Sequence, residues 1–87
     1  MVKIDIYTSA TCPYCKRAKA LLRSKGASFN EFEVDGNPEL ITESVKRSNG
    51  MRTVPQIFIE NFHVGGYDEL NSLEKNGKLD SLLGVIP

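Results

Sequence analysis

The sequence lacks tryptophan and has little cysteine or histidine, with two cysteines and one histidine among 87 residues. It also lacks an excess of charge, because eleven Lys and Arg residues balance eleven Asp and Glu residues. General binders of nucleic acid or of anionic membranes carry a basic excess, so we expect neither partner. No apolar run approaches the roughly 20 residues that span a bilayer, and the first residues alternate where a signal peptide is continuously apolar. We therefore expect a soluble, cytoplasmic protein.

The remaining composition is ordinary for a globular protein, with 40% apolar and 25% charged residues. It shows none of the bias that marks disorder or fibres. A chain of 87 residues falls in the size range of one domain and can bury a small core without disulfides. We expect a single domain over residues 1–87, acting as a monomer.

The first third of the chain has the pattern of a strand, a helix and a second strand. Val2, Ile4 and Ile6 alternate with other residues at the two-residue period of a strand. Residues 13–25 change to helical spacing and stop at a glycine, and residues 29–34 form a second short strand. A crossover of this kind places the two strands side by side and parallel. The helical apolar stripe consists of Tyr14, Ala18, Leu21 and Leu22.

The rest of the chain predicts a helix, a hairpin and a closing helix. Asn37 and Pro38 are a typical cap and first residue, with Ile41 and Val45 facing inward. On the same helix Glu43 faces Arg47 at the spacing of an ion pair.

Residues 56–59 and 62–65 are two apolar runs close enough for an antiparallel hairpin. A closing helix follows, with a break at Gly77. The order βαβαββα predicts an α/β fold, a four-stranded mixed sheet flanked by helices, in which residues 57–59 are buried on both sides.

The two cysteines, Cys12 and Cys15, lie where the first strand ends and the first helix begins. A structural disulfide closing so short a ring removes little chain entropy. A structural zinc needs four ligands, and His63 would be only the third, so we predict no metal site. Two inert core cysteines are a further alternative, but Pro13 at the first helical position leaves Cys12 exposed. The pattern favours a thioredoxin-like redox pair.

The reactive form of cysteine is the thiolate, which free N–H groups at a helix N-terminus stabilise. Cys12 lies where those groups point, and the amides of Tyr14 and Cys15 are candidate donors. Cys15 lies one turn further in, within disulfide reach and better covered. We therefore predict Cys12 as the attacking nucleophile and Cys15 as the resolving cysteine.

Three segments together resemble the bacterial dithiol glutaredoxins with a Cys-Pro-Tyr-Cys site. They are Thr11-Cys12-Pro13-Tyr14-Cys15, Thr53-Val54-Pro55 and Gly65-Gly66-Tyr67-Asp68, and the resemblance covers nearly the full length. It implies a thioredoxin-like fold and glutathione-dependent reduction of protein disulfides and glutathione mixed disulfides. Glutathione would then be the reducing co-substrate, with no tightly bound cofactor. The partners it implies are disulfide-containing or glutathionylated proteins, and it permits ribonucleotide reductase among them.

The resemblance also implies a glutathione site formed by Tyr14, Thr53, Val54, Pro55, Gly66, Tyr67 and Asp68. A cis Pro55 would turn the backbone of Val54 toward Cys12, where it would pair with the cysteine of glutathione. The γ-glutamyl end would bind at the glycine pair and the following helix start. Local sequence alone fits equally well a turn followed by Asp68 as a helix cap.

One departure from that family concerns charge. Many glutaredoxins have a lysine three residues before the first active cysteine, where this chain has Ser9, and Arg52 is the nearby candidate to replace that charge. Two alternatives stay open from the sequence. One is a glutaredoxin-like redoxin reduced by thioredoxin reductase, and the other is an iron–sulfur carrier in which two subunits and two glutathiones share a cluster.

Overall fold

The computed structural model describes residues 2–84 of the chain. Its elements, in chain order, are β1 (Ile4–Thr8), α1 (Pro13–Ser24), β2 (Asn30–Glu33), α2 (Pro38–Arg47), β3 (Gln56–Ile59), β4 (Phe62–Gly65), α3 (Tyr67–Lys75) and α4 (Lys78–Leu83). The closing helix is divided into α3 and α4 at Gly77, whose φ of 74° glycine adopts readily. Within residues 2–84, no helix has both the length and the apolar character that a membrane crossing requires.

The four strands form one mixed sheet in the order β2-β1-β3-β4. β1 and β2 are parallel, as the strand–helix–strand pattern predicts, whereas β3 runs antiparallel to both of its neighbours. The predicted hairpin is confirmed, with residues 60 and 61 joining β3 to β4. β1 and β3 are the central strands, and every residue in both of them is buried.

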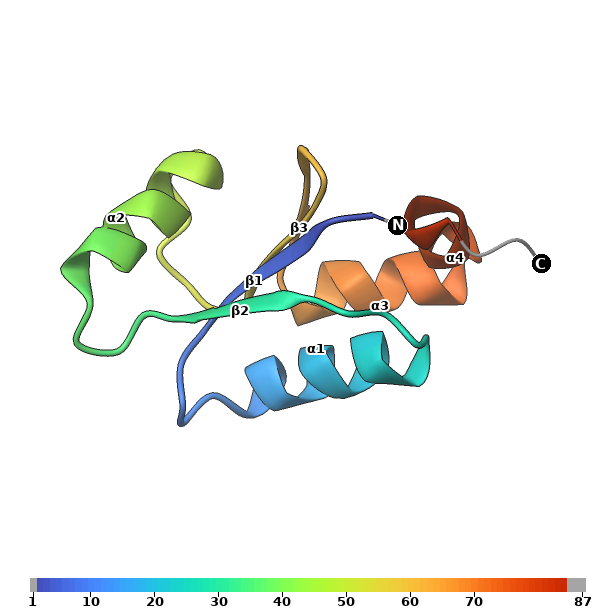
Figure 1. Cartoon of the computed structure of the whole chain (residues 1–87), viewed down its shortest axis with the longest axis horizontal. Helices are drawn as coiled ribbons and strands as arrows, with labels where there is room; N and C mark the ends of the chain where they lie inside the picture. The colour runs from blue at the N-terminus through green and yellow to red at the C-terminus, as the bar shows by residue number, and fades with distance from the viewer. Residues whose placement is uncertain (1, 85–87) are drawn as a thin grey trace.

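Two helices cover one face of this sheet. α1 and α3 run side by side below it in Figure 1, and α4 lies against the end of α3. α2 stands apart, at the end of the sheet remote from α4 (Figure 1). The main core therefore lies between the sheet and the helices other than α2, and it comprises Ile4, Ile6, Ala18, Leu22, Ile57, Ile59, Val64, Leu70, Leu79 and Leu83.

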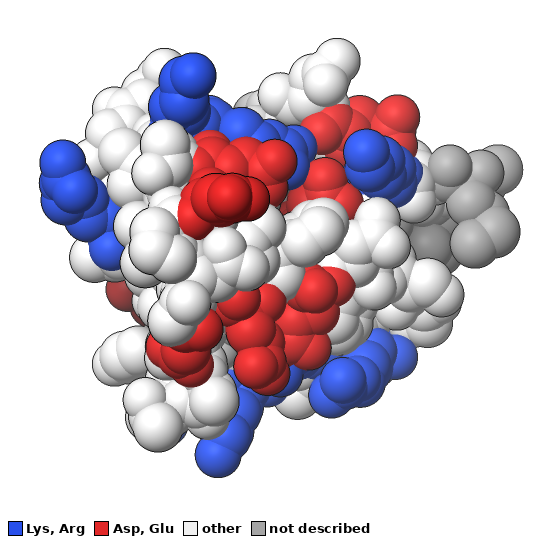
Figure 2. All heavy atoms as spheres, turned by 60° about the vertical axis from the view of Figure 1, so that its left-hand side comes forward, with Lys and Arg blue, Asp and Glu red and all other residues white. Residues whose placement is uncertain are grey.

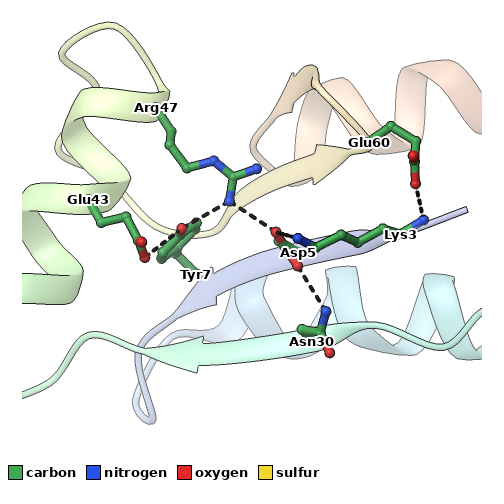
Figure 3. A network of polar contacts seen from close by, with 7 residues as sticks. All are labelled: Lys3, Asp5, Tyr7, Asn30, Glu43, Arg47 and Glu60. Carbon is green, nitrogen blue, oxygen red and sulfur yellow. Dashed lines mark hydrogen bonds and ion pairs between the residues drawn. The ribbon is translucent and has the colours of Figure 1, made fainter.

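The second face of the sheet carries a partly buried polar network (Figure 3). The hydroxyl of Tyr7 donates to Glu43 at 2.8 Å and accepts from Arg47 at 3.0 Å. Arg47 also donates to the carboxylate of Asp5 at 3.0 Å, and Asn30 donates to the other oxygen of that carboxylate at 3.1 Å. Both faces of β1 are thus buried, one beneath its isoleucines and the other within this network.

α2 meets the sheet through polar side chains, which corrects two predictions. The sequence predicts that Ile41 faces inward, but it is 43% exposed, and Ser44 is the buried residue of the helix. The sequence also pairs Glu43 with Arg47, but both side chains bind Tyr7 on the sheet. The physical reason is the position of α2 at the end of the sheet, where its apolar stripe has no core to enter.

Candidate active site

Cys12 is the N-cap of α1. β1 ends at Thr8, and a short loop brings Cys12 to the helix with extended backbone angles, φ −96° and ψ 109°. Pro13 occupies the first helical position, where its missing N–H costs nothing because that group has no intrahelical partner. The amide of Cys15 donates to the sulfur of Cys12 at 3.1 Å. The sulfur thus takes the place of a capping oxygen, and a thiolate there is stabilised by the donor and the helix dipole.

The two sulfurs differ in solvent access. Cys15 is completely buried, whereas Cys12 is half-buried. Burial first, and then its hydrogen bond with Cys12, together raise the pKa of Cys15 to about 12. Cys15 therefore stays protonated at neutral pH while Cys12 is reduced, which agrees with its predicted role as the second cysteine to react.

Asp35 holds the loop that precedes Cys12. Its carboxylate accepts hydrogen bonds from the backbone amide of Ala10 and from the hydroxyl of Ser9, each at 2.8 Å. The carbonyl of Ser9 in turn accepts from the amide of Cys12 at 3.2 Å. The Ala10 bond, with help from Ser9, lowers the pKa of Asp35. The position at which many glutaredoxins have a lysine is thus occupied here by a hydroxyl tied to an acid.

The segment from Thr53 to Pro55 lies against the active sulfur. The peptide bond between Val54 and Pro55 is cis, as the resemblance implied. The carbonyl oxygen of Val54 lies 3.7 Å from the sulfur of Cys12, within reach of a thiol donor. The side-chain amide of Gln56 donates to the carbonyl of Thr53 at 3.0 Å and fixes the segment from behind.

The start of α3 is capped by a glycine. Gly66 is the N-cap and Asp68 lies in the first turn, so the alternative of Asp68 as the helix cap does not hold. The carboxylate of Glu69 accepts from the amide of Gly66 at 2.7 Å. At Gly65, with φ of 113°, a Cβ would lie 2.9 Å from that carboxylate, so only glycine fits.

One groove brings these segments together. It has a volume of about 210 Å³, and every residue predicted to bind glutathione lines it: Tyr14, Thr53, Val54, Pro55, Gly66, Tyr67 and Asp68. Sequence reasoning missed three further lining residues, Met51, Gln56 and Glu69. Glu69 carries a signal that could have found it, because an acid three residues after an N-cap is typical of a capping box. Met51 carries none.

Tyr14 lies at the mouth of the groove. Its side chain is 53% exposed, so its place in the apolar stripe of α1 does not put it in the core. Its ring stacks on that of Tyr67, with centroids 6.2 Å apart, and the guanidinium of Arg17 lies 5.3 Å from its centroid. The buried positions of α1 are Cys15, Ala18 and Leu22. Tyr14 lies in the first turn, where it reaches the groove instead.

Among residues 2–84, the structure groups no three His, Cys, Asp or Glu side chains in a way that could hold a metal ion. What the arrangement provides is one accessible sulfur beside a backbone strand and a helix N-terminus. Those parts suit the exchange of a disulfide with a small thiol whose backbone and carboxylates need partners.

Comparison with known proteins gives close matches. Residues 4–64 match the family model described as Glutaredoxin. The chain is 57% identical over 83 residues to glutaredoxin 3 of Escherichia coli (strain K12), which covers 95% of this chain and 99% of that protein. It is 54% identical over 85 residues to a Pseudomonas aeruginosa glutaredoxin, covering 98% of this chain and 100% of the relative.

Solved structures agree with these sequence matches. A solution structure of glutaredoxin from Brucella melitensis is 56% identical, with a TM-score of 0.84, covering 98% of this chain and 91% of that one. A crystal structure of a buckwheat glutaredoxin–glutathione complex is 31% identical with a TM-score of 0.84, and it covers 99% of this chain and 83% of that one. The four-stranded mixed sheet with flanking helices is thus the thioredoxin-like fold.

Proposed function

This chain belongs to the glutaredoxin family, and on that premise we propose how its two sulfurs and its groove divide the work of a dithiol enzyme. The activity is glutathione-dependent thiol–disulfide exchange, with Cys12 and Cys15 as its Cys-x-x-Cys pair. The observation that carries the division of roles is the asymmetry of the pair. Cys12 is accessible and receives an amide hydrogen bond, whereas Cys15 is buried and held protonated.

Glutathione mixed disulfides need only Cys12. Its thiolate attacks the glutathione sulfur, forms a Cys12–glutathione disulfide and releases the substrate thiolate, which takes a proton from water. A second glutathione thiolate then attacks the glutathione sulfur of this intermediate. That step releases oxidised glutathione and returns Cys12 as the thiolate.

Protein disulfides use both cysteines. Cys12 attacks one substrate sulfur, and the other substrate sulfur leaves as a thiolate. Cys12 then no longer carries a charge, so the contacts that raise the pKa of Cys15 are reduced to burial. Cys15 gives up its proton and attacks Cys12, forming the Cys12–Cys15 disulfide and releasing the second substrate thiol. Two glutathiones restore the dithiol in the cytoplasm, where thiols are kept reduced.

Glutathione lies along the groove in this proposal. The carboxylate of its γ-glutamyl end binds the first-turn amides of α3, and the neighbouring ammonium group meets the carboxylate of Asp68. The amide of Gly66 is already used by Glu69, so the amides of Tyr67 and Asp68 are the donors. The cysteine of glutathione pairs with the backbone of Val54 beside the sulfur of Cys12.

The glycine end of glutathione then points toward Ser9 and Arg52, which line one neighbouring hollow. Arg52 is exposed, and it supplies a positive charge for the glycine carboxylate where the family often has a lysine at the position of Ser9. This arrangement gives each carboxylate of glutathione its own partner, a helix N-terminus at one end and a guanidinium at the other.

Single-cysteine variants test the proposal with two substrates, the mixed disulfide of glutathione with 2-mercaptoethanol and a protein disulfide. Cys15→Ser should keep turnover of the first and lose the second, whereas Cys12→Ser should lose both. Asp68→Asn should raise the KM for the mixed disulfide and leave kcat nearly unchanged. Turnover that survives Cys12→Ser would reverse the roles of the two cysteines.

A further inference from the structure

A second hollow adjoins the glutathione groove on the other side of Val54. Its volume is about 270 Å³, and it shares Met51, Thr53 and Val54 with the groove. The groove runs from those residues to the start of α3, whereas the hollow runs to α2 and to the loop before Cys12. The two are therefore successive parts of one surface that passes the active sulfur.

The hollow has an apolar part beside Arg52, the residue proposed above to bind the glycine carboxylate. Half of its ten lining residues are apolar, namely Val34, Ile41, Val45, Met51 and Val54. Two of these apolar side chains are unusually exposed, Ile41 at 43% and Met51 at 48%. Apolar side chains left open beside a reaction centre mark a binding surface. An apolar cavity of about 150 Å³ can hold a benzene ring, so this hollow has room for a branched side chain.

The direction of the bound substrate decides what can enter. With the γ-glutamyl end at α3, the residue that follows the substrate cysteine lies at the hollow. In glutathione that residue is glycine, which has no side chain and leaves the apolar part of the hollow unfilled. A protein substrate presents a side chain at the same position.

The charged residues around the hollow are of both signs. Residues 31–43 contain five acidic and no basic residues, and the lining itself carries one acid, Asp35, and one base, Arg52. Figure 2 turns the α2 side of the molecule forward, and on this face Asp and Glu gather centrally while Lys and Arg lie toward the margins. Arg52 is thus available to the backbone carboxylate of the substrate, whereas the apolar lining residues favour an apolar side chain.

We propose that this hollow, lined by Ile41, Val45 and Met51, binds the residue that follows the reacting cysteine of a protein substrate and prefers an apolar side chain there. This inference rests on the proposed function, in which the γ-glutamyl end of glutathione lies at α3 and its glycine end lies at the hollow. The preferred substrates are disulfides in which the cysteine attacked by Cys12 is followed by an apolar residue of about the size of leucine. The chemistry is unchanged. Cys12 and Cys15 supply the electron pair that reduces the substrate disulfide, and they are themselves oxidised to the Cys12–Cys15 disulfide.

Symmetric tripeptide disulfides test the inference directly. The probes are oxidised γ-Glu-Cys-Gly, γ-Glu-Cys-Leu and γ-Glu-Cys-Ser, each mixed in excess with the reduced wild-type protein. Each reaction converts one tripeptide disulfide to two tripeptide thiols and the protein dithiol to its disulfide. The second-order rate constant from quenched samples should be about five- to tenfold larger for the leucine peptide than for the glycine peptide, as expected for partial burial of one leucine side chain. The serine peptide should match the glycine peptide.

Ile41→Ser locates the effect. This variant should abolish the leucine preference and leave the rate with oxidised glutathione unchanged. Phe62→Ser is the matched control, because Phe62 is also a half-exposed apolar residue but does not line the hollow. It should keep the preference.

The outcomes separate the two proposals. If oxidised glutathione reacts but the rate constant of the leucine peptide is no larger than that of the glycine peptide, the hollow does not bind the substrate side chain. The glutathione mechanism then still stands. A leucine preference that persists in Ile41→Ser would also overturn the inference, because the side chain would then bind elsewhere. Failure of the wild type to react with any of the three peptides would instead contradict the proposed function.

Discussion

The guanidinium of Arg47 lies over the ring of Phe58, with its central carbon 4.1 Å from the ring centroid. This contact joins α2 to β3 across the face of the sheet that the main core does not occupy. The same guanidinium donates to the Asp5 carboxylate, whose side chain is only 6% exposed. Arg47 therefore attaches α2 to the sheet, as apolar side chains attach the other helices. The chain continues from α2 directly into the segment that lines the groove.

Replacing Arg47 should show how much this tether contributes. Arg47→Met keeps much of the packing but leaves the buried carboxylate of Asp5 with only the exposed Lys3, 3.9 Å away, as a counter-charge. Breaking a fully buried pair costs about 3–5 kcal/mol, and because the Arg47 side chain is partly solvated we expect a loss of about 2 kcal/mol in the free energy of unfolding. Urea unfolding measures it.

A double-mutant cycle gives the control for that loss. Asp5→Asn in the Arg47→Met background should recover part of the stability, because no charge is then left buried and unpaired. Lys16→Met, which removes an exposed cation, should change the free energy of unfolding by less than about 0.5 kcal/mol. If Arg47→Met lowers the free energy of unfolding equally in the wild type and in Asp5→Asn, the ion-pair explanation is contradicted.

These contacts also show where sequence reasoning stops. The periods of two and 3.6 residues predicted the order of strands and helices, and the position of Cys12 before a helix predicted which sulfur is exposed. The same periods could not place Ile41, because its exposure depends on where α2 lies relative to the sheet. The bonds from Tyr7 to Glu43 and Arg47 join residues 36 and 40 positions apart, and no local pattern encodes such pairs.

The candidate site also contains residues that the sequence could predict and residues that it could not. Short motifs supplied the residues of the groove through a family resemblance, and the structure places all of them along one surface. The clamp of Asp35 on the loop before Cys12 could not be predicted, because it depends on the parallel pairing that sets the end of β2 beside the end of β1. Met51 lines the groove because the chain between α2 and β3 bends there, and nothing in its own residue type indicates this.

The raised pKa of Cys15 predicts a loss of stability at alkaline pH in the reduced protein. A group whose pKa is higher in the folded than in the unfolded state contributes stability below its unfolded value and loses it as the pH rises toward the folded value. For Cys15 that window runs from about 9 to about 12. Under reducing conditions, the free energy of unfolding should fall more steeply for wild type than for Cys15→Ala above pH 9. All other groups are the same in the two proteins, so parallel curves would contradict burial of the thiol as the cause.

Asp35 predicts the opposite trend in acid. Its pKa is lowered, first by the Ala10 amide and then by the Ser9 hydroxyl, so its contribution is present above its ordinary value of 3.8 and disappears as the pH falls through the folded value. Asp35→Asn should therefore flatten the decline of the urea midpoint between pH 5 and pH 2. Glu33→Gln removes another exposed carboxylate of the same region and should leave the slope closer to that of wild type. A wild-type slope in Asp35→Asn would show that the clamp does not depend on the charge.

The hydroxyl of Ser9 and the guanidinium of Arg52 make a prediction about charge at the glycine end of glutathione. Arg52→Gln should raise the KM for the glutathione–mercaptoethanol disulfide about two- to fivefold at low salt, because exposed ion pairs contribute about 0.2–1 kcal/mol. The increase should shrink at 0.5 M salt, where charges are screened within a few ångströms. Adding Ser9→Lys to Arg52→Gln returns a cation to the same hollow and should lower the KM again. Ser9→Ala in that background controls for loss of the bond to Asp35, and Lys78→Gln, on α4, controls for net charge. If Ser9→Lys and Ser9→Ala change the KM equally in the Arg52→Gln background, the substrate carboxylate does not bind a cation at this end of the groove.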